Sequence, residues 1–327
     1  MINKSIQIEK GVPGNATVNS CTSKAYISYP TSNFILVVNL NNGSIDAKIP
    51  ANSPGNIVVN SVTNKVYVSS AYGICEIDGI DNQYELINIG LPHWDGSVDI
   101  NPLTNLLYTT CFGHDILTVI DTASQSIVDK IPVGKNPKGV AVDIHANKIY
   151  VANYNSSSVS IIDCYQSNQV VDSIIFGKKN STINPKFVLV NESSEILYVI
   201  TDSAENWITP GVGAGGVRYK SILYVVDTIT KEDINSKGLA FNSGVGFAFN
   251  HGNNGIYMMK PGERSVLKLD ESARESVGIT TLDKPSILKR LFGMNIIFFA
   301  EIIAVNPLTN KVYVSDSENN LLYEIDG

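Results

Sequence analysis

Short runs of alternating apolar and polar residues, separated by turns rich in Asn and Asp, cover this chain of 327 residues from end to end. One phrase recurs seven times: a β-run, a polar turn centred on Asn, a run that carries Tyr, and a run that closes on Asp. The tyrosines of the seven copies are Tyr26, Tyr67, Tyr108, Tyr150, Tyr198, Tyr257 and Tyr313. Units of about 40 to 50 residues with several short strands each are typical of a β-propeller.

The fourth unit shows the pattern of strands most clearly. Alternation and turn residues predict strands over 139–144, 148–152, 158–163 and 170–177. Asn and Asp suit the turns because they tolerate left-handed backbone and hydrogen-bond to their own main chain. β-branched residues fill both faces of the middle strands, as expected for sheets that stack against neighbouring sheets. Each unit is therefore expected to fold as a four-stranded antiparallel blade.

The two ends of the chain complement each other. The seventh unit stops after its third strand, at 321–326, whereas an unassigned run at 4–11 precedes the first unit. That run resembles a fourth strand, so we expect it to complete the last blade and remove the open edges. The sequence thus predicts an all-β, seven-bladed β-propeller, a single domain over residues 1–327 with its ring closed by the N-terminal strand.

Composition narrows the possible partners. The net charge is −7 and charged residues make up 17% of the chain, with a pI near 5.1. A nucleic-acid partner requires a basic face, so we expect none. The four cysteines, Cys21, Cys75, Cys111 and Cys164, show no metal-type spacing and are expected to be small buried or half-buried packing residues.

The sequence does not indicate one cellular compartment for this protein. The longest apolar run, 294–305, is interrupted by Asn295 and Glu301 and is too short to span a bilayer. The first residues do not read as a signal peptide. The protein is therefore expected to be cytoplasmic, or extracellular or at the cell surface if a targeting segment has been removed.

The repeat itself resembles a known family. The segments Ile149-Tyr-Val-Ala-Asn153, Val66-Tyr-Val-Ser-Ser70 and Val312-Tyr-Val-Ser-Asp316, with an Asn-Pro-Leu-Thr-Asn-Lys lead-in and a closing Ile-Asp, are similar to the YVTN-repeat β-propellers. That family is frequent among archaeal surface-layer and bacterial exported proteins. The resemblance covers essentially the whole chain and is strongest in repeats two, three, four and seven. It implies a binding, scaffold or surface role, and its motif carries no catalytic residue.

Candidate chemistry concentrates in two loops of the third unit. His93, Trp94 and Asp95 precede its first strand, and His114 and Asp115 follow its second strand. Both loops should project from the top face, the end of a blade opposite the Asn-centred turns. They could form a small polar pocket, a metal site or a general base. The alternative, which we favour, is that the histidines satisfy loop backbone and Trp94 covers the channel mouth, because no ligand spacing here is diagnostic.

Two other irregularities interrupt the repeat. The glycine-rich insertion 201–220 carries Trp207 and Arg218 and is expected to be a partner-binding loop, a lid or disordered decoration on the top face. It has no phosphate-loop spacing. The segment 283–292 is expected to form a short amphipathic helix that caps a blade; the alternative is that it docks a partner or a membrane surface, for which Lys289 and Arg290 supply few charges. His145 and His251 fall in Asn-centred turns and are expected to be turn residues.

Two classes of function follow. The favoured one is a non-catalytic binding or scaffold propeller, associated with the cell surface or envelope, that recognises a protein or small ligand through its top-face loops. The alternative is a hydrolase or lyase similar to propeller lactonases or streptogramin lyases, with a metal- or His-dependent site at the channel mouth. That alternative rests on analogy of fold. No cofactor is expected beyond a possible divalent metal at the channel mouth.

Overall fold

The computed structural model describes residues 2–88, 90, 96–165, 168–177, 183–208, 215–239, 246–260, 265–282 and 302–327; side chains are described for these residues except within 204–219 and at residue 260. The candidates His93, Trp94 and Asp95 and the helix expected over 283–292 lie outside the described residues.

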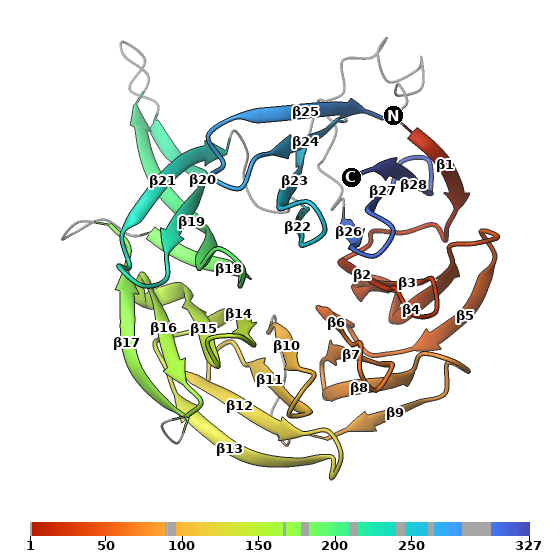
Figure 1. The fold of residues 1–327 in the computed structure, drawn as a ribbon, viewed down its shortest axis with the longest axis horizontal. Helices are drawn as coiled ribbons and strands as arrows, with labels where there is room; N and C mark the ends of the chain where they lie inside the picture. The colour runs from red at the N-terminus through yellow and green to blue at the C-terminus, as the bar shows by residue number, and fades with distance from the viewer. Residues whose placement is uncertain are drawn as a thin grey trace. The chain divides into compact units, whose positions relative to one another are not determined.

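Seven four-stranded antiparallel sheets make this chain a seven-bladed β-propeller, as predicted (Figure 1). Within a blade, strands that are neighbours in the sequence pair with each other. The chain groups into two compact units: unit 1 contains residues 1–54 and 244–327, and unit 2 contains residues 55–243. The single domain expected over 1–327 stays a prediction.

Unit 1 holds blades 1, 6 and 7. Blade 1 is β2 (Asn15–Asn19), β3 (Lys24–Tyr29), β4 (Phe34–Asn39) and β5 (Ile45–Pro50), with a 3-10 turn at Pro30–Ser32. Blade 6 is β22 (Phe247–Asn250), β23 (Gly255–Lys260), β24 (Ser265–Leu269) and β25 (Ser276–Thr281). Blade 7 is β26 (Ile303–Asn306), β27 (Lys311–Asp316), β28 (Leu321–Asp326) and β1 (Ile2–Gln7).

Unit 2 holds blades 2 to 5. Blade 2 is β6 (Ile57–Asn60), β7 (Lys65–Ser70), β8 (Gly73–Asp78) and β9 (Tyr84–Ile87). Blade 3 is β10 (Val98–Asn101), β11 (Leu106–Thr110), β12 (Ile116–Asp121) and β13 (Ser126–Pro132). Blade 4 is β14 (Pro137–Asp143), β15 (Lys148–Asn153), β16 (Ser158–Asp163) and β17 (Gln169–Ile175), with a 3-10 turn at Tyr154–Ser156. Blade 5 is β18 (Ile183–Asn191), β19 (Ile196–Ile208), β20 (Gly215–Asp227) and β21 (Asp233–Leu239).

The N-terminal strand completes blade 7, which confirms the expected closure. β1 pairs with β28, with Ile6 opposite Leu322, and the amide of Ile8 donates to the carbonyl of Asn320 at 2.8 Å. Ile6 is 3% exposed and packs in the core of unit 1. β1 begins and ends a few residues earlier than the predicted span, and it covers the edge of β28, which would otherwise be open to another strand.

Within each unit, buried side chains lie between consecutive blades. The seven repeat tyrosines are all buried, as the repeat predicts. In unit 2, one core cluster joins Tyr108 and Val119 of blade 3 to Val142 and Ile149 of blade 4. Apolar faces of neighbouring sheets thus cover each other, which explains why both faces of the middle strands carry β-branched residues.

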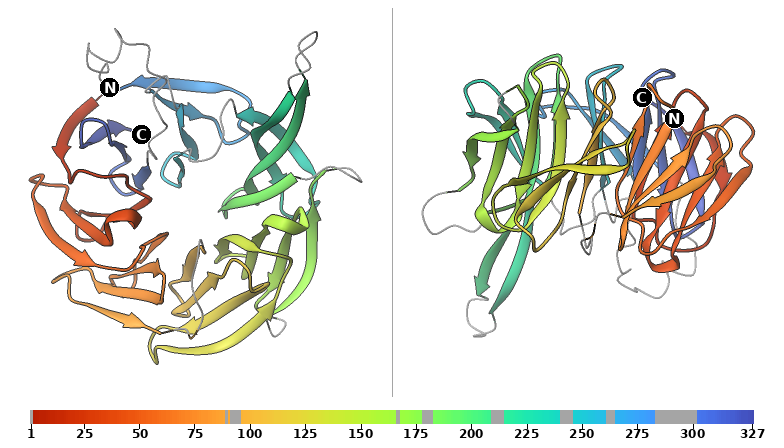
Figure 2. Two further views of the ribbon diagram at one scale, coloured as in Figure 1. Left: turned by 180° about the vertical axis from the view of Figure 1, so that it is seen from behind. Right: turned by 90° about the horizontal axis from the view of Figure 1, so that it is seen from below.

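The insertion after Tyr198 is not the loop that the sequence suggests. Residues 201–208 and 215–220 continue β19 and β20, and the ladder runs out to the pair Ile208 and Gly215. In Figure 2 this hairpin projects beyond the other strands of unit 2. Pairing along 201–208 and 215–220 satisfies backbone hydrogen bonds of these strands, which the glycine content of the segment alone does not predict.

All four cysteines lie in the described part of the chain, and none of them forms a disulfide there. Cys75 and Cys111 are buried and Cys164 is half-buried, as expected, but Cys21 is exposed because it lies at the tip of the β2–β3 turn. A helix with the length and apolar character of a membrane span does not occur among the described residues.

Candidate functional site

The described half of the top-face cluster consists of His114 and Asp115 in the β11–β12 loop. Both residues are exposed. Asp115 adopts left-handed backbone with φ 45°, and its Oδ1 accepts a 2.8 Å hydrogen bond from the amide of Asn136. Asp115 therefore ties its loop to the β13–β14 loop. Whether this cluster binds a ligand stays a prediction.

Trp207 and Arg218 lie on the long hairpin, Trp207 on β19 and Arg218 on β20. In the ladder, Trp207 is opposite Gly216 and Arg218 is opposite Glu205. Their role in binding stays a prediction.

Buried asparagines stabilise the turns between the first and second strands, at the end of the blades opposite the top face. The first strand of six blades ends in a buried asparagine, namely Asn19, Asn60, Asn101, Asn191, Asn250 and Asn306. The Oδ1 atom of Asn60, for example, accepts hydrogen bonds from the amides of Val62 (3.0 Å) and Thr63 (3.1 Å). The side chain therefore replaces water as the acceptor for the turn.

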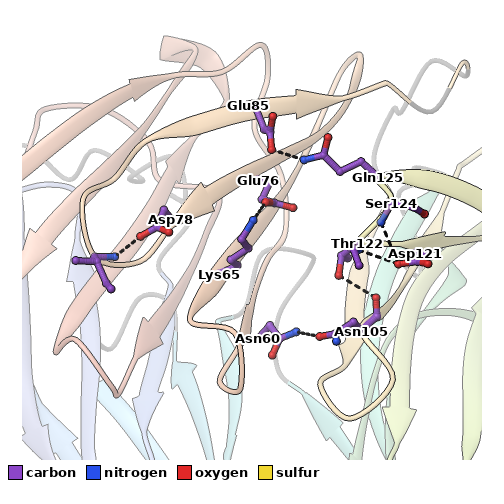
Figure 3. A network of polar contacts seen from close by, with 12 residues as sticks. Asn60, Lys65, Glu76, Asp78, Glu85, Asn105, Asp121, Thr122, Ser124 and Gln125 are labelled. Atoms are coloured by element: carbon purple, nitrogen blue, oxygen red, sulfur yellow. Dashed lines mark hydrogen bonds and ion pairs between the residues drawn. The ribbon is translucent and has the colours of Figure 1, made fainter.

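The amide nitrogen of the same side chain links neighbouring blades. Nδ2 of Asn60 donates to Oδ1 of Asn105 in the next blade at 2.9 Å, and Gln125 of blade 3 donates to Glu85 of blade 2 (Figure 3). In unit 1, Nδ2 of Asn250 donates to Oδ1 of Asn310 at 2.7 Å. Asn105 and Asn310 both occupy the left-handed position of the first turn of their blade. We call this contact the amide bridge.

The junction of blades 4 and 5 lacks the residues for an amide bridge. The strand-end position is Asp143, which is 3% exposed, and the left-handed turn position of blade 5 is Glu195 (φ 56°). Oδ1 of Asp143 accepts a hydrogen bond from the amide of Ala146 at 2.8 Å, so the turn itself is preserved. A carboxylate has no N–H to donate, so the link to the next blade cannot form.

Glu192 lies against this junction from blade 5. Its Oε1 accepts a hydrogen bond from the amide of Ile144 at 3.1 Å, and its Oε2 contacts Nδ1 of His145. Ligand atoms of Asp143, His145 and Glu192 all lie within 4.8 Å of one another. We call these three residues the Asp–His–Glu cluster. They are the residues that could hold a metal ion among those that the structure describes.

Asp99 of blade 3 faces the opposite side of β14. Its Oδ2 accepts the amide of Val142 at 2.8 Å, and its Oδ1 accepts the amide of Ile100 at 2.8 Å. Carboxylates of blades 3 and 5 therefore bind two backbone amides of blade 4, at Val142 and Ile144. Negative charge thus collects around the end of β14.

Burial and the neighbouring carboxylate raise the pKa values of Asp99 and Asp143. Burial, and to a smaller extent the charge of Glu192, raises the pKa of the Asp99 carboxyl from 3.8 to about 7 against the opposing effect of its two backbone hydrogen bonds. Burial also raises the pKa of Asp143, and Glu192 acts in the same direction. Asp99 is thus a carboxyl that titrates near neutral pH.

Sequence reasoning did not identify the Asp–His–Glu cluster. It assigned His145 to a turn, which is correct, and gave it no partner. A signal was present, because Asp143 and Glu195 are acidic where most repeats have Asn. The contact with Glu192 spans 47 residues, however, and only the packing of blade 5 on blade 4 reveals it.

Apolar side chains stand at the tips of several turns of unit 2. Each follows, by two residues, the Asn or Asp that caps the turn, and each donates its own amide to that side chain; these residues are Val62, Ile80, Leu103, Tyr165 and Ile229. Their exposed fractions range from 62% for Ile229 to 79% for Tyr165. The turns join first to second or third to fourth strands, so they lie at the same end of their blades. We call these five residues the turn-tip residues.

Two small pockets lie along the blades. One, of ≈ 220 Å³, is lined by Lys65, Glu76, Asp78, Gln83, Tyr84 and Glu85 of blade 2. Another, of ≈ 190 Å³, lies in unit 1 between blades 6 and 7, beside Lys268 and Asp326. Both are smaller than the roughly 300–1,000 Å³ typical of small-molecule sites.

Comparison with known proteins supports the fold. The chain is similar to the solved structure of Kuenenia stuttgartiensis hydrazine synthase, with a TM-score of 0.73 over 98% of this chain and 97% of that chain. The two chains share a fold. Their sequences are 16% identical, so the likeness extends to architecture and no further. No protein-family model matches the sequence, and no curated protein matches it. Membership of the YVTN-repeat family therefore stays a prediction.

Proposed function

We propose that this chain is a non-catalytic binding propeller that recognises a protein through the turn-tip residues of unit 2. The observation that carries the proposal is the recurrence of a large, exposed apolar side chain at one position of five turns. Solvent-exposed apolar residues are ordinary when they occur singly. A set that recurs at one turn position, at one end of the blades, gives unit 2 several apolar contact points for a partner.

The turn does not itself require an apolar residue at its tip. Equivalent positions of unit 2 carry His145, Ser193 and Ala123. The turn is held by the amide of the tip residue and by the capping carboxylate or amide oxygen, as at Leu103 and Asn101 (3.0 Å). The turn thus uses the backbone of the tip residue and not its side chain, which can therefore serve in binding a partner. Burying a Val, Leu or Ile side chain at an interface is worth about 1.5–3 kcal/mol.

A protein partner fits these observations better than a small ligand does. The turn-tip residues lie on turns of four blades and offer separated contacts, as a broad protein surface would require. The two pockets are smaller than usual ligand sites. Recognition through the top-face loops with His114 and Asp115 stays the second candidate, since Asp115 already positions its loop.

Cell-surface or envelope association forms part of the same proposal. It rests on the resemblance of the Val-Tyr-Val-Ser and Ile-Tyr-Val-Ala segments to the YVTN-repeat family. Antibody labelling of intact and permeabilised cells tests it: the proposal expects equal signals, and signal only after permeabilisation overturns this part.

Site-specific photo-crosslinking tests the binding face. A benzoylphenylalanine at position 103 should give a discrete covalent adduct with a second protein in cells of the source organism. The same residue at position 155, on the exposed β15–β16 loop at the other end of blade 4, serves as the matched control. Adducts at 155 but not at 103 would move the site to the top face and overturn the proposal.

A second variant tests whether the protein crosslinked at position 103 is held by the turn-tip residues or only lies near them by chance. Replacement of Val62 and Tyr165 by Ser should remove the adduct formed at 103, because both side chains belong to the proposed contact surface. Circular dichroism should remain that of the parent, since both residues are exposed. An undiminished adduct would show that the apolar tips do not contribute to binding.

A further inference from the structure

We propose that the Asp–His–Glu cluster binds a divalent transition-metal cation, of the class of Zn²⁺ or Mn²⁺, between blades 4 and 5. The three residues come from two blades. Asp143 ends β14, His145 follows it in the β14–β15 turn, and Glu192 begins the β18–β19 turn. A bound cation would therefore join two blades at a single point.

One ligand of the proposed site is buried, and the other two can be reached from solvent. Asp143 is 3% exposed, so its position is fixed by the surrounding sheet. The side chain of Glu192 is 16% exposed and that of His145 is 78% exposed, which leaves an open route from solvent. Ligand atoms within 4.8 Å of one another can share an ion at the usual bond lengths of about 2.0–2.2 Å once the contact between His145 and Glu192 opens to admit it. The exposed His145 side chain is free to make that movement.

An independent observation also indicates a cation here. At the junctions of blades 2 and 3 and of blades 6 and 7, a neutral amide bridge links the end of a first strand to the next blade. At the junction of blades 4 and 5 both bridge positions are acidic, Asp143 and Glu195. Neither acidic side chain can donate the hydrogen bond of an amide bridge, and a cation bound by Asp143 and Glu192 would add a link between the two blades.

Nearby charges reinforce the preference for a cation. Glu192 adds a further carboxylate at the junction, and Asp99 approaches the same strand from blade 3. The imidazole of His145 is the basic group that the structure pairs with Glu192. A metal ion concentrates more positive charge at this point than an imidazolium can.

The ligand types select the class of metal. Carboxylate oxygens suit Mg²⁺, Ca²⁺ and Mn²⁺, whereas an imidazole nitrogen suits Zn²⁺. Three protein ligands leave further positions for water. We therefore expect Zn²⁺ to bind at least about tenfold more tightly than Mg²⁺.

Calorimetric titration of the metal-free full chain with ZnCl₂ tests the site. Wild type should bind one Zn²⁺ at this site, and Asp143→Asn and His145→Ala should each weaken that binding at least about tenfold through loss of a ligand. Asp143→Asn introduces the residue that six other blades carry at this position, so the variant is expected to fold. His251→Ala is the matched control, because His251 lies in the equivalent turn of blade 6 and should leave affinity unchanged.

Imidazole NMR provides a second readout. The chain has 4 histidines, so their ring signals can be assigned by substitution. Added Mn²⁺ should broaden the His145 ring signal first. Broadening of all four signals together, or equal Zn²⁺ affinity in wild type, Asp143→Asn and His145→Ala, would overturn the proposal. The result is independent of the turn-tip residues, since none of them is a proposed ligand.

Discussion

The carboxyl of Asp99 should make this protein less stable as the pH rises from 5 to 8. Its pKa in the folded protein is raised from 3.8 to about 7, chiefly by burial. The folded state therefore holds a proton that the unfolded chain releases at a lower pH. Stability from this group is fully present below pH 3.8 and is lost as the pH rises through about 7.

The size of the effect follows from the two pKa values. Linkage gives a loss of about 2–3 kcal/mol in the free energy of unfolding between pH 5 and pH 8 for this group alone. Asp99→Asn removes the titration. The new amide keeps one acceptor for the amides of Val142 and Ile100, so one of these hydrogen bonds is lost. The lost hydrogen bond should make the variant about 1 kcal/mol less stable. Because the variant has no titrating group at position 99, it should not show the fall in stability between pH 5 and pH 8 that Asp99 causes in its parent.

Urea unfolding followed by circular dichroism at pH 5, 6, 7 and 8, without metal, measures both proteins. The difference between the two pH profiles isolates Asp99, because other titrating groups are present in both. Asp121→Asn is the control: hydrogen bonds from the amides of Ala123 and Ser124 lower the pKa of Asp121, so its contribution is lost only in more acidic solution. An Asp99→Asn profile parallel to that of wild type would refute the reasoning.

Three further changes test the packing of the blades by the same unfolding assay. Asn60→Ala should cost about 1–3 kcal/mol, because it leaves turn amides without their acceptor and removes the amide bridge. Asp202→Ala should cost about 3–5 kcal/mol, because it leaves the ammonium of Lys186, 2.8 Å away, buried without its counter-charge. Gly73→Ala should cost about 1–3 kcal/mol, because Gly73 has φ +149° and a Cβ there would lie 2.2 Å from the carbonyl oxygen of Ile87.

Each of these has a matched comparison. Asn60→Asp keeps the acceptor for the turn and removes only the donor, so it should cost less than Asn60→Ala. Adding Lys186→Met to Asp202→Ala should recover most of the loss, because the uncompensated charge is gone. Gly90→Ala, at a glycine where an added Cβ would meet nothing within 4 Å, should cost less than Gly73→Ala. Equal costs within any pair would contradict the mechanism given for it.

The strands of this protein could be predicted because their signals are local. In blade 4, the predicted spans differ from β14 to β17 by at most two residues at either end. Alternation of apolar and polar positions defines the strands, and Asn or Asp followed by left-handed backbone defines the turns. The pairing of β1 with β28 was also predictable, because the last repeat lacks a strand that the N-terminus supplies.

The sequence by itself determined the seven blades and the conformations of their turns. Tertiary structure decided what lies beside each turn. Residues 201–208 and 215–220 extend β19 and β20 because the two strands pair with each other along their full length. Likewise, His145 meets Glu192 and Asp99 meets Val142 only because blades 3, 4 and 5 pack side by side. These two contacts between blades join residues that are 47 and 43 positions apart, a separation that local sequence patterns do not encode.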